Sequence, residues 1–206
     1  MSSDTVRSGG RGRSPATSRE ELGRIGLDLF IERGFDRVTV DDIAAAAGIG
    51  RRTFFRYYTT KNEVAWGDFD ALLDGFRAAL DRAPAEASLV EAIRSAVREF
   101  NTVPESELPR HRHRMRILLT TPDLVAYSTI RYAEWREVIA AFVARRLGLD
   151  PRAAVPQAVA WACLGISLSA YEEWVDGVDD DVLALIDAAF RGLGAVFAER
   201  APGGRS

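Results

Sequence analysis

Apolar residues recur along this chain every three or four positions, and no segment alternates apolar and polar residues for long enough to predict a strand. The three-to-four spacing places apolar side chains on one face of an α-helix. Glycine and proline, which end helices, interrupt the periodic stretches. We therefore expect an all-α fold of about nine helices, with breaks at Gly34, 48–50, Pro84, Pro104, Pro109, Pro122, 147–151 and Gly177.

Several expected helix starts carry a hydroxyl residue that is followed three positions later by an acid. The hydroxyl can accept a hydrogen bond from an unpaired amide of the first turn, and the acid lies near the positive end of the helix dipole. Such pairs begin at Thr17 or Ser18, Thr39, Thr60 and Ser88. Pro156 either kinks the eighth helix or marks its beginning.

Composition and periodicity divide the chain into four segments. Residues 1–16 are rich in Ser, Gly and Arg and predict a disordered basic arm, which either binds DNA or is an inert extension. We expect a helix-turn-helix domain over residues 17–62, a second helical domain over residues 63–200 and a disordered tail over residues 201–206. One helix, residues 61–83, is expected to cross the boundary and could transmit movement between the domains.

Charge is distributed unevenly along the chain. The net charge is −3, but residues 1–61 hold 11 Lys and Arg against 8 Asp and Glu, whereas the remainder holds 16 against 22. A basic first third on an acidic body suits a module that approaches DNA.

The composition argues against several other classes of protein. We expect no membrane span and no secretory signal, because no apolar run reaches 18 residues and none follows the polar N-terminus. Cys163 is the only cysteine and His111 and His113 are the only histidines, so neither a disulfide nor a zinc site is expected. The lack of a span and of a signal, together with the single cysteine, predicts a cytoplasmic protein. With no catalytic triad or phosphate-binding glycine loop in the sequence, we expect that it is not an enzyme and uses no cofactor.

The stretch 39–61, TVDDIAAAAGIGRRTFFRYYTTK, predicts two short helices joined by a glycine turn. Phe54 and Tyr58 are four apart and should face inward, which turns Arg51, Arg52 and Phe55 outward. Arginine can bind the O6/N7 edge of guanine with two donors, and an apolar ring can contact the thymine methyl. The alternative is a helical hairpin with a solvated basic face. Thr53, Tyr57 and Lys61 are expected to contact phosphates. The full set of expected DNA contacts is Thr39, Arg51, Arg52, Thr53, Phe55, Arg56, Tyr57 and Lys61.

The same stretch resembles the DNA-binding signature of TetR-family transcriptional regulators. Thr39 and two acids precede Ile-Ala, a small apolar residue follows Ala-Gly at the turn, and Thr, aromatics and a closing Lys61 come after. Gly50, Arg52 and Phe55 depart from the usual serine, glycine and tyrosine, so the operator should differ from better-known ones. The segments GRRTFFRYY, KNEVAWGDFDALL, HRHRMR and RYAEWR are similar to the regulators associated with mycofactocin gene clusters. The resemblance implies a dimeric repressor that a small ligand releases from DNA.

The second domain is rich in aromatic residues and holds one dense cationic run at residues 110–116. The aromatic set permits an apolar pocket between helices. The run is either a solvated face that pairs with Glu105 and Glu107 or the mouth of an anion-binding pocket. Because several TetR-like regulators respond to fatty acyl-CoA, we expect such an effector, with an uncharged hydrophobic effector as the alternative. The expected ligand-binding residues are Phe69, Phe76, Phe100, Arg112, Arg114, Arg116, Tyr127, Trp135, Trp161 and Tyr171.

The last helix carries a wide apolar stripe with spacings of three and four. Together with Val159, Ala162, Ile166 and Ala170 on the preceding helix, it could form half of a four-helix interface in a homodimer. The alternative is that the stripe packs within one subunit. The expected dimer contacts are Val182, Leu185, Ile186, Ala189, Phe190, Leu193 and Phe197.

The sequence thus predicts a ligand-responsive DNA-binding regulator, expected to be a repressor. Its expected partners are double-stranded operator DNA, a second copy of the chain and a small effector. The alternative function is a helical small-molecule-binding protein whose basic module does not regulate transcription.

Overall fold

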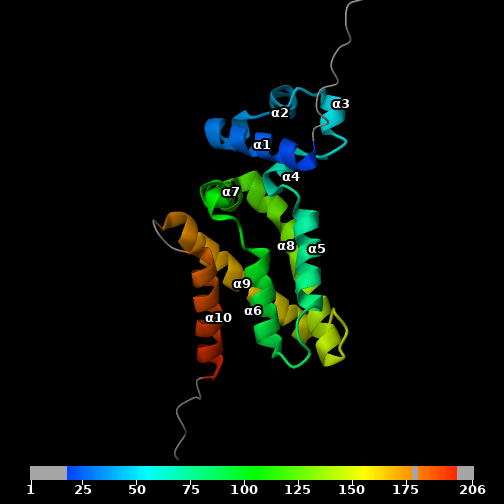
Figure 1. Cartoon of the computed structure of the whole chain (residues 1–206), viewed down its shortest axis with the longest axis vertical. Helices are drawn as coiled ribbons and strands as arrows, with labels where there is room; N and C mark the ends of the chain where they lie inside the picture. The colour runs from blue at the N-terminus through cyan, green and yellow to red at the C-terminus, as the bar shows by residue number, and fades with distance from the viewer. Residues whose placement is uncertain (1–17, 178–180, 199–206) are drawn as a thin grey trace, which may run out of the picture. The chain divides into compact units, whose positions relative to one another are not determined.

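The computed structural model describes residues 18–177 and 181–198 of the chain (Figure 1). Within these ranges the chain forms ten α-helices, two short 3-10 helices and no strand. The prediction of an all-α fold is confirmed. The predicted arm, 1–16, and tail, 201–206, lie outside the described residues.

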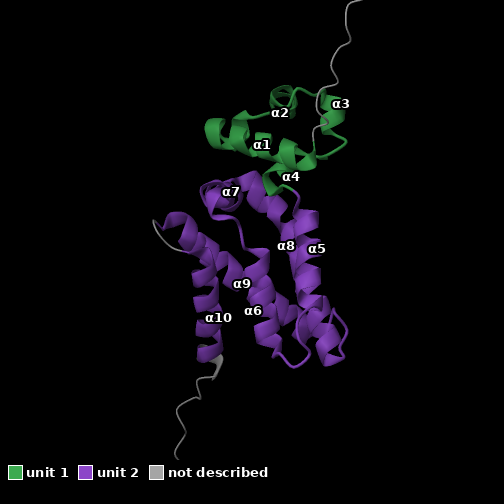
Figure 2. Ribbon diagram, in the orientation of Figure 1, with its two compact units in different colours: residues 1–67 green, residues 68–206 purple. Residues whose placement is uncertain are grey.

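The chain divides into two compact units, residues 1–67 (unit 1) and 68–206 (unit 2) (Figure 2). In unit 1, α1 packs against α2 and α4, and α2 packs against α3. Its elements are α1 (Arg19–Arg33), η1 (Phe35–Arg37), α2 (Val40–Ala46), α3 (Arg51–Phe54) and α4 (Lys61–Trp66). Every one of these elements contributes to an apolar core that includes Leu22, Leu27, Phe30, Phe35, Ile43, Phe54, Tyr58 and Val64.

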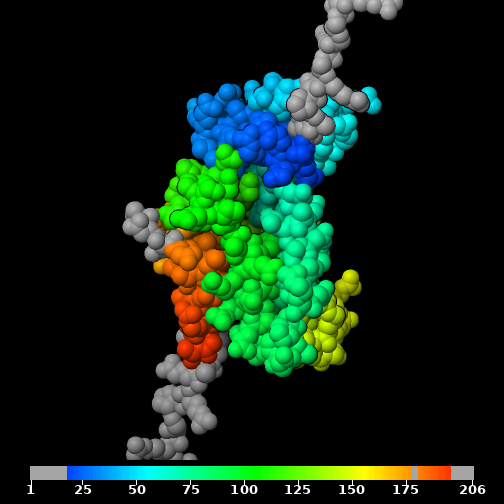
Figure 3. All heavy atoms as spheres, in the orientation of Figure 1, coloured from blue at the N-terminus to red at the C-terminus, as the bar shows by residue number. Residues whose placement is uncertain are grey.

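Unit 2 is a bundle in which α8 and α9 pack along each other. α10 packs against α9 and α6, α5 packs against α6 and α8, and α7 packs against α8 and α9. On the face drawn in Figure 3, α6 lies between α5 and α10. The elements are α5 (Phe69–Asp81), α6 (Leu89–Phe100), η2 (Glu105–Glu107), α7 (Leu108–Thr120), α8 (Pro122–Leu147), α9 (Ala154–Asp176) and α10 (Val182–Ala198).

Residues 61–83 form two helices, so the expected single helix across the boundary is wrong. α4 ends at Trp66, and Gly67 adopts φ 67° and ψ −142°. Asp68 then caps α5, accepting a hydrogen bond from the Ala71 amide at 3.5 Å. Glycine reaches this backbone conformation without the steric cost that other residues meet. The split accounts for ten α-helices where about nine were expected. The two compact units divide at the same place, between Gly67 and Asp68.

α9 is 23 residues long with a mean hydropathy of 1.3 over its most apolar 18 residues, which would suffice to cross a membrane by length and composition alone. It packs against α8 and α10 within unit 2. That packing is typical of the core helix of a globular protein. The helix begins at Ala154, and Pro156 lies in its first turn, where a missing amide removes no intrahelical hydrogen bond.

Candidate nucleic-acid interface and effector site

Thr39 caps α2, the first helix of the helix-turn-helix in unit 1. Its hydroxyl accepts a hydrogen bond from the Asp42 amide at 3.1 Å, and the Asp42 carboxylate accepts one from the Thr39 amide at 2.8 Å. Hydrogen bonds from the Thr39 side chain and amide lower the pKa of Asp42. Thr39 is exposed, but its hydroxyl already serves the start of α2.

A glycine turn joins α2 to α3. The Ile49 amide donates to the Ala44 carbonyl at 2.9 Å, and Gly48 has a φ of 65°. A side chain at Gly48 would meet no atom within 4 Å. Glycine is therefore favoured here by the backbone angle and not by a lack of space, and the turn sets the direction in which α3 leaves α2.

One face of the α3 segment is anchored in the core. Phe54 is 0% exposed and Tyr58 1%, with their ring centres 6.0 Å apart. Both face inward, as the spacing predicts. The Tyr58 hydroxyl donates to the Arg19 carbonyl at 2.9 Å, while the Arg19 guanidinium donates to the Tyr57 carbonyl. Sequence reasoning missed Arg19, because a contact with residues so far along the chain leaves no periodic signal.

The opposite face of α3 is cationic and open to solvent. Arg51 and Arg52 are exposed and Phe55 is 44% exposed, so the predicted outward orientation of these side chains is confirmed. Nη1 of Arg51 donates to Oδ2 of Asp41 at 2.8 Å, and its guanidinium carbon lies 5.4 Å from the centre of the Phe55 ring. These side chains are of the types that read base edges in the major groove.

The remaining expected DNA contacts are partly engaged within unit 1. Thr53 and Tyr57 are half-buried, and the exposed Arg56 donates to the Tyr57 hydroxyl at 3.2 Å. Nζ of Lys61 donates to the Phe35 carbonyl at 2.9 Å and lies 4.0 Å from the centre of that ring. An ammonium group has three donors, so a phosphate contact by Lys61 would be made in addition to this internal hydrogen bond.

In unit 2, four expected ligand-binding residues form one aromatic cluster. Phe76 stacks on Trp135 with 5.2 Å between ring centres and lies 5.1 Å from Phe100, which meets Phe69 edge-on at 6.1 Å. Phe69, Phe76 and Trp135 are buried, whereas Phe100 is half-buried. The rings come from α5, α6 and α8, so the cluster joins three helices.

A buried chain of hydrogen bonds begins at Asn101, the residue after α6. The Tyr171 hydroxyl donates to Oδ1 of Asn101 at 2.8 Å, and Nε2 of His111 lies 2.9 Å from the same hydroxyl. Because that hydroxyl has only one proton, Nε2 of His111 must donate, which fixes the tautomer of the neutral ring. Burial, with a smaller contribution from Arg114, lowers the pKa of His111 to about 4, and burial raises the pKa of Tyr171.

Two arginines of the cationic run bind the end of α9. Arg112 donates to the Gly177 carbonyl and Arg116 to the Val175 carbonyl. The last carbonyls of a helix lack intrahelical partners and carry the negative end of its dipole, so guanidinium groups stabilise this end. The run therefore fastens α7 to α9, a role that neither interpretation of the sequence included. Arg114 is half-buried on the same helix.

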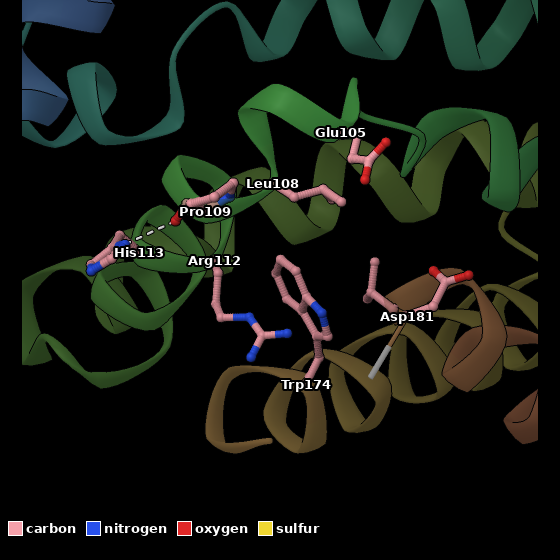
Figure 4. Close-up of a pocket in the computed structure, with 8 residues that line it drawn as sticks. Glu105, Leu108, Pro109, Arg112, His113, Trp174 and Asp181 are labelled. Carbon is pink, nitrogen blue, oxygen red and sulfur yellow. Dashed lines mark hydrogen bonds between the residues drawn. The ribbon is translucent and has the colours of Figure 1, made fainter. Parts of the chain in front are cut away.

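A pocket of about 540 Å³ opens beside Arg112 (Figure 4). Trp174 points into it from α9, and the Arg112 guanidinium carbon lies 4.6 Å from the centre of the Trp174 ring. The volume is that of small-molecule sites in general. Its lining combines apolar Leu108, Trp174 and Val182 with charged Glu105, Arg112 and Asp181.

Tyr127 and Trp161 differ in their surroundings. Tyr127 is half-buried, with its ring centre 5.8 Å from the guanidinium of Arg131, which also lies 5.7 Å from the Phe69 ring. Trp161 is 57% exposed, with the Arg136 guanidinium 3.6 Å from its ring centre. The expected ligand role of Trp161 does not fit this placement, because position 161 falls on the exposed face of α9.

Much of the apolar stripe of α10 packs inside a single chain. Val182, Ile186 and Phe190 are buried against other helices of unit 2, with Phe190 8% exposed. The same chain therefore already covers the apolar surface of these three side chains, which were expected to contact a second copy of the chain. Leu185, Ala189 and Leu193 are half-buried, and the side chain of Phe197 lies outside the described residues.

Comparison with known proteins agrees with this division of the chain. Residues 25–65 match the family described as bacterial regulatory proteins, tetR family, and residues 87–198 match the MftR C-terminal domain. The chain is 48% identical over 184 residues to the mycofactocin biosynthesis transcriptional regulator MftR of Mycobacterium tuberculosis, covering 89% of this chain and 93% of that protein. It is 34% identical over 146 residues to the transcriptional regulator TcmR of Streptomyces glaucescens, covering 68% of this chain and 65% of that protein.

Two solved structures share the fold. Thermus thermophilus FadR, a TetR-family repressor in complex with lauroyl-CoA, superposes with a TM-score of 0.60 at 25% identity and covers 91% of this chain and 100% of that chain. SmeT, the repressor of a Stenotrophomonas maltophilia multidrug efflux pump, superposes with a TM-score of 0.60 at 21% identity and covers 88% of this chain and 90% of that chain.

Proposed function

The chain belongs to the TetR family of transcriptional regulators, and we propose that it is a repressor that a small-molecule effector releases from operator DNA. The outer face of α3 carries the proposal. Arg51, Arg52 and Phe55 are exposed there while Phe54 and Tyr58 anchor the segment in the core. A helix that is held on one side and cationic on the other can enter the major groove.

In this proposal the contacts divide into two kinds. Arg51, Arg52 and Phe55 meet base edges, which specifies sequence. The remaining side chains meet the DNA backbone, which positions the protein without reading bases. These backbone contacts are Thr39, Thr53, Arg56, Tyr57 and Lys61.

A mobility-shift titration of the full chain against the DNA upstream of its own gene tests this function. A shift that survives an excess of random DNA of equal length supports an operator there. If random DNA competes for the chain as well as the upstream DNA does, the alternative of a helical small-molecule-binding protein is favoured. A reporter fused to that upstream DNA should rise when the gene for this chain is deleted, as expected for a cytoplasmic repressor.

We infer that the regulator acts as a homodimer, because two recognition helices must reach half-sites about one helical turn apart. Since Val182, Ile186 and Phe190 are occupied within one chain, the interface would use the exposed face of α9 around Trp161 and the half-buried stripe of α10. Trp161→Glu should sediment as a folded monomer, whereas Phe190→Glu should unfold the chain. A Trp161→Glu protein that remains a dimer would place the interface elsewhere.

An acyl-CoA is the effector that we propose first. The structure of FadR, which shares the fold, is that of its complex with lauroyl-CoA. In the present chain the pocket beside Arg112 joins apolar side chains to a guanidinium, which suits a ligand with an apolar part and an anionic part. Mass spectrometry of ligand carried through purification, followed by titration of the DNA complex with lauroyl-CoA, tests the ligand class.

An uncharged apolar effector is the second candidate, and the same pocket holds the observation that favours it. Glu105 and Asp181 line the pocket and would repel a polyanionic head group, while Arg112 already donates to the Gly177 carbonyl. Release of DNA by dodecanol but not by lauroyl-CoA would favour this candidate. Release by lauroyl-CoA alone would favour the first.

Release requires that the effector bind one conformation better than the other. A tenfold loss of operator affinity corresponds to about 1.4 kcal/mol of coupling. The chain passes between the two units at Gly67, whose backbone angles favour glycine, and we infer that this junction takes the place of the expected shared helix. Gly67→Ala should change the effector concentration needed for release, whereas Gly75→Ala within α5, where an added side chain meets no atom within 4 Å, should not.

A further inference from the structure

The guanidinium of Arg51 lies between a carboxylate and an aromatic ring. Its Nη1 donates to Asp41 at 2.8 Å, and its central carbon lies 5.4 Å from the centre of the Phe55 ring. Asp41 belongs to α2, whereas Arg51 and Phe55 belong to the α3 segment, one helical turn apart. The two partners therefore hold the guanidinium from different elements, although all three side chains are exposed.

The start of α3 has a reason to attract such a carboxylate. Gly50 caps the helix without a side-chain hydrogen bond, and the first turn holds two arginines and no acid. Cations are unfavourable at the positive end of a helix. Asp41 offsets that charge at Arg51, while among the described residues no ion pair involves Arg52.

We propose that Asp41 is a positioning residue for DNA recognition, which, together with Phe55, presents the guanidinium of Arg51 to a base edge. This inference rests on the proposed function of unit 1. Nη1 is held by Asp41, which leaves Nε and Nη2 to form the paired contact that arginine makes with guanine. A side chain that is already oriented loses less conformational freedom on binding, so the arrangement favours the matching base.

The negative charge of Asp41 should also disfavour DNA binding, and this second effect makes the proposal testable. Asp41 is a negative charge on the surface that faces a polyanion, so it should weaken binding to every DNA sequence. Positioning and repulsion thus predict opposite effects of Asp41→Asn. Binding to random DNA should strengthen about twofold to threefold, because one repulsive charge is lost. Binding to the preferred sequence should weaken about threefold to tenfold, because Arg51 loses its orientation.

The experiment selects preferred DNA from a randomised pool with the wild-type chain, and then measures the affinity of each variant for that DNA and for random DNA. Asp36→Asn is the matched control, because Asp36 is an exposed acid of the same unit outside the Asp41–Arg51 pair. It should leave the ratio of specific to random affinity unchanged. Asp41→Glu, which keeps the charge, should recover most of the ratio.

A double-mutant cycle shows whether Asp41 acts through Arg51. Asp41→Asn should have no effect on the affinity ratio in an Arg51→Ala background and its full effect in an Arg52→Ala background. A change of the ratio that persists without Arg51 would overturn the proposal, as would an equal rise in both affinities. A wild-type chain that selects no sequence would instead refute the proposed function itself, and the role of Asp41 with it.

Discussion

Each unit of this protein has a helix rich in arginine, α3 in unit 1 and α7 in unit 2, and the arginine side chains have different surroundings on the two helices. On α3, Arg51 and Arg52 point to solvent from a turn whose other face is buried. On α7, Arg112 and Arg116 reach the carbonyls that end α9. The nearby backbone makes the difference, because a helix end offers unpaired acceptors that a guanidinium will bind.

The comparison shows why a cationic run does not identify its own role. A charge pattern indicates where cations are, but the acceptor they meet is supplied by another part of the chain. We expect the arginines of α7 to contribute mainly to stability and those of α3 mainly to DNA binding.

The largest expected effect tests the α7 side of this comparison. Arg112→Ala combined with Arg116→Ala removes two charged donors from the end of α9 and should lower the free energy of unfolding by about 3 kcal/mol. Urea unfolding measures it. Arg77→Ala, which loses only an exposed ion pair with Asp74, should stay within about 0.5 kcal/mol of wild type. A double variant as stable as wild type would mean that the run is a solvated face.

A second test separates His111 from the arginines on the same helix. Burial lowers its pKa from the ordinary 6.5 to about 4, so the folded state holds the neutral ring. The contribution of His111 to the free energy of unfolding is fully present above pH 6.5. It is lost as the pH falls towards 4, by about 1.4 kcal/mol per pH unit, because the unfolded state then binds a proton that the folded state does not. Unfolding titrations between pH 7 and 5 measure the slope. His111→Gln should flatten it, whereas exposed His113→Gln should leave it in place; an unchanged slope in His111→Gln would contradict the assignment.

The α3 side of the comparison predicts a binding effect without a stability effect. Arg52→Ala should weaken operator binding by about 2 kcal/mol and relax the preference at one base position, as expected for loss of a guanine contact. Its unfolding midpoint should not change, because no ion pair within the described residues is lost. Affinities for single-base variants of the operator measure the preference. A uniform loss across all sequences would reassign Arg52 to the DNA backbone.

Lys61→Ala has the smallest expected effect. Like the arginines of α7, Lys61 has an acceptor within its own unit, and like those of α3 it is expected to contact DNA. Its ammonium donates to Phe35, so Lys61→Ala should cost about 1 kcal/mol of stability. If it also meets a phosphate, the slope of log affinity against log salt should flatten by about one unit, equally for specific and random DNA. Lys61→Arg, which keeps the charge, should preserve the slope. Loss of stability with an unchanged slope would make Lys61 purely structural.

The sequence alone determined the class of fold and which face of the α3 segment is buried and which is exposed. Both follow from local periodicity: four-residue spacing sends Phe54 and Tyr58 to the same side, and Arg51, Arg52 and Phe55 must then turn outward. The caps at Thr39 and Ser88 are equally local, because donor and acceptor lie three residues apart.

Only the tertiary structure decided where helix 61–83 breaks, since the angles of Gly67 depend on what flanks it and glycine also occurs within helices. It also decided that Phe190 packs within its own chain while Trp161 remains exposed, because an apolar stripe does not specify which surface covers it. The partners of Arg112, His111 and Arg51 come from other helices, and hydrogen bonds between distant segments leave no periodic trace in a sequence.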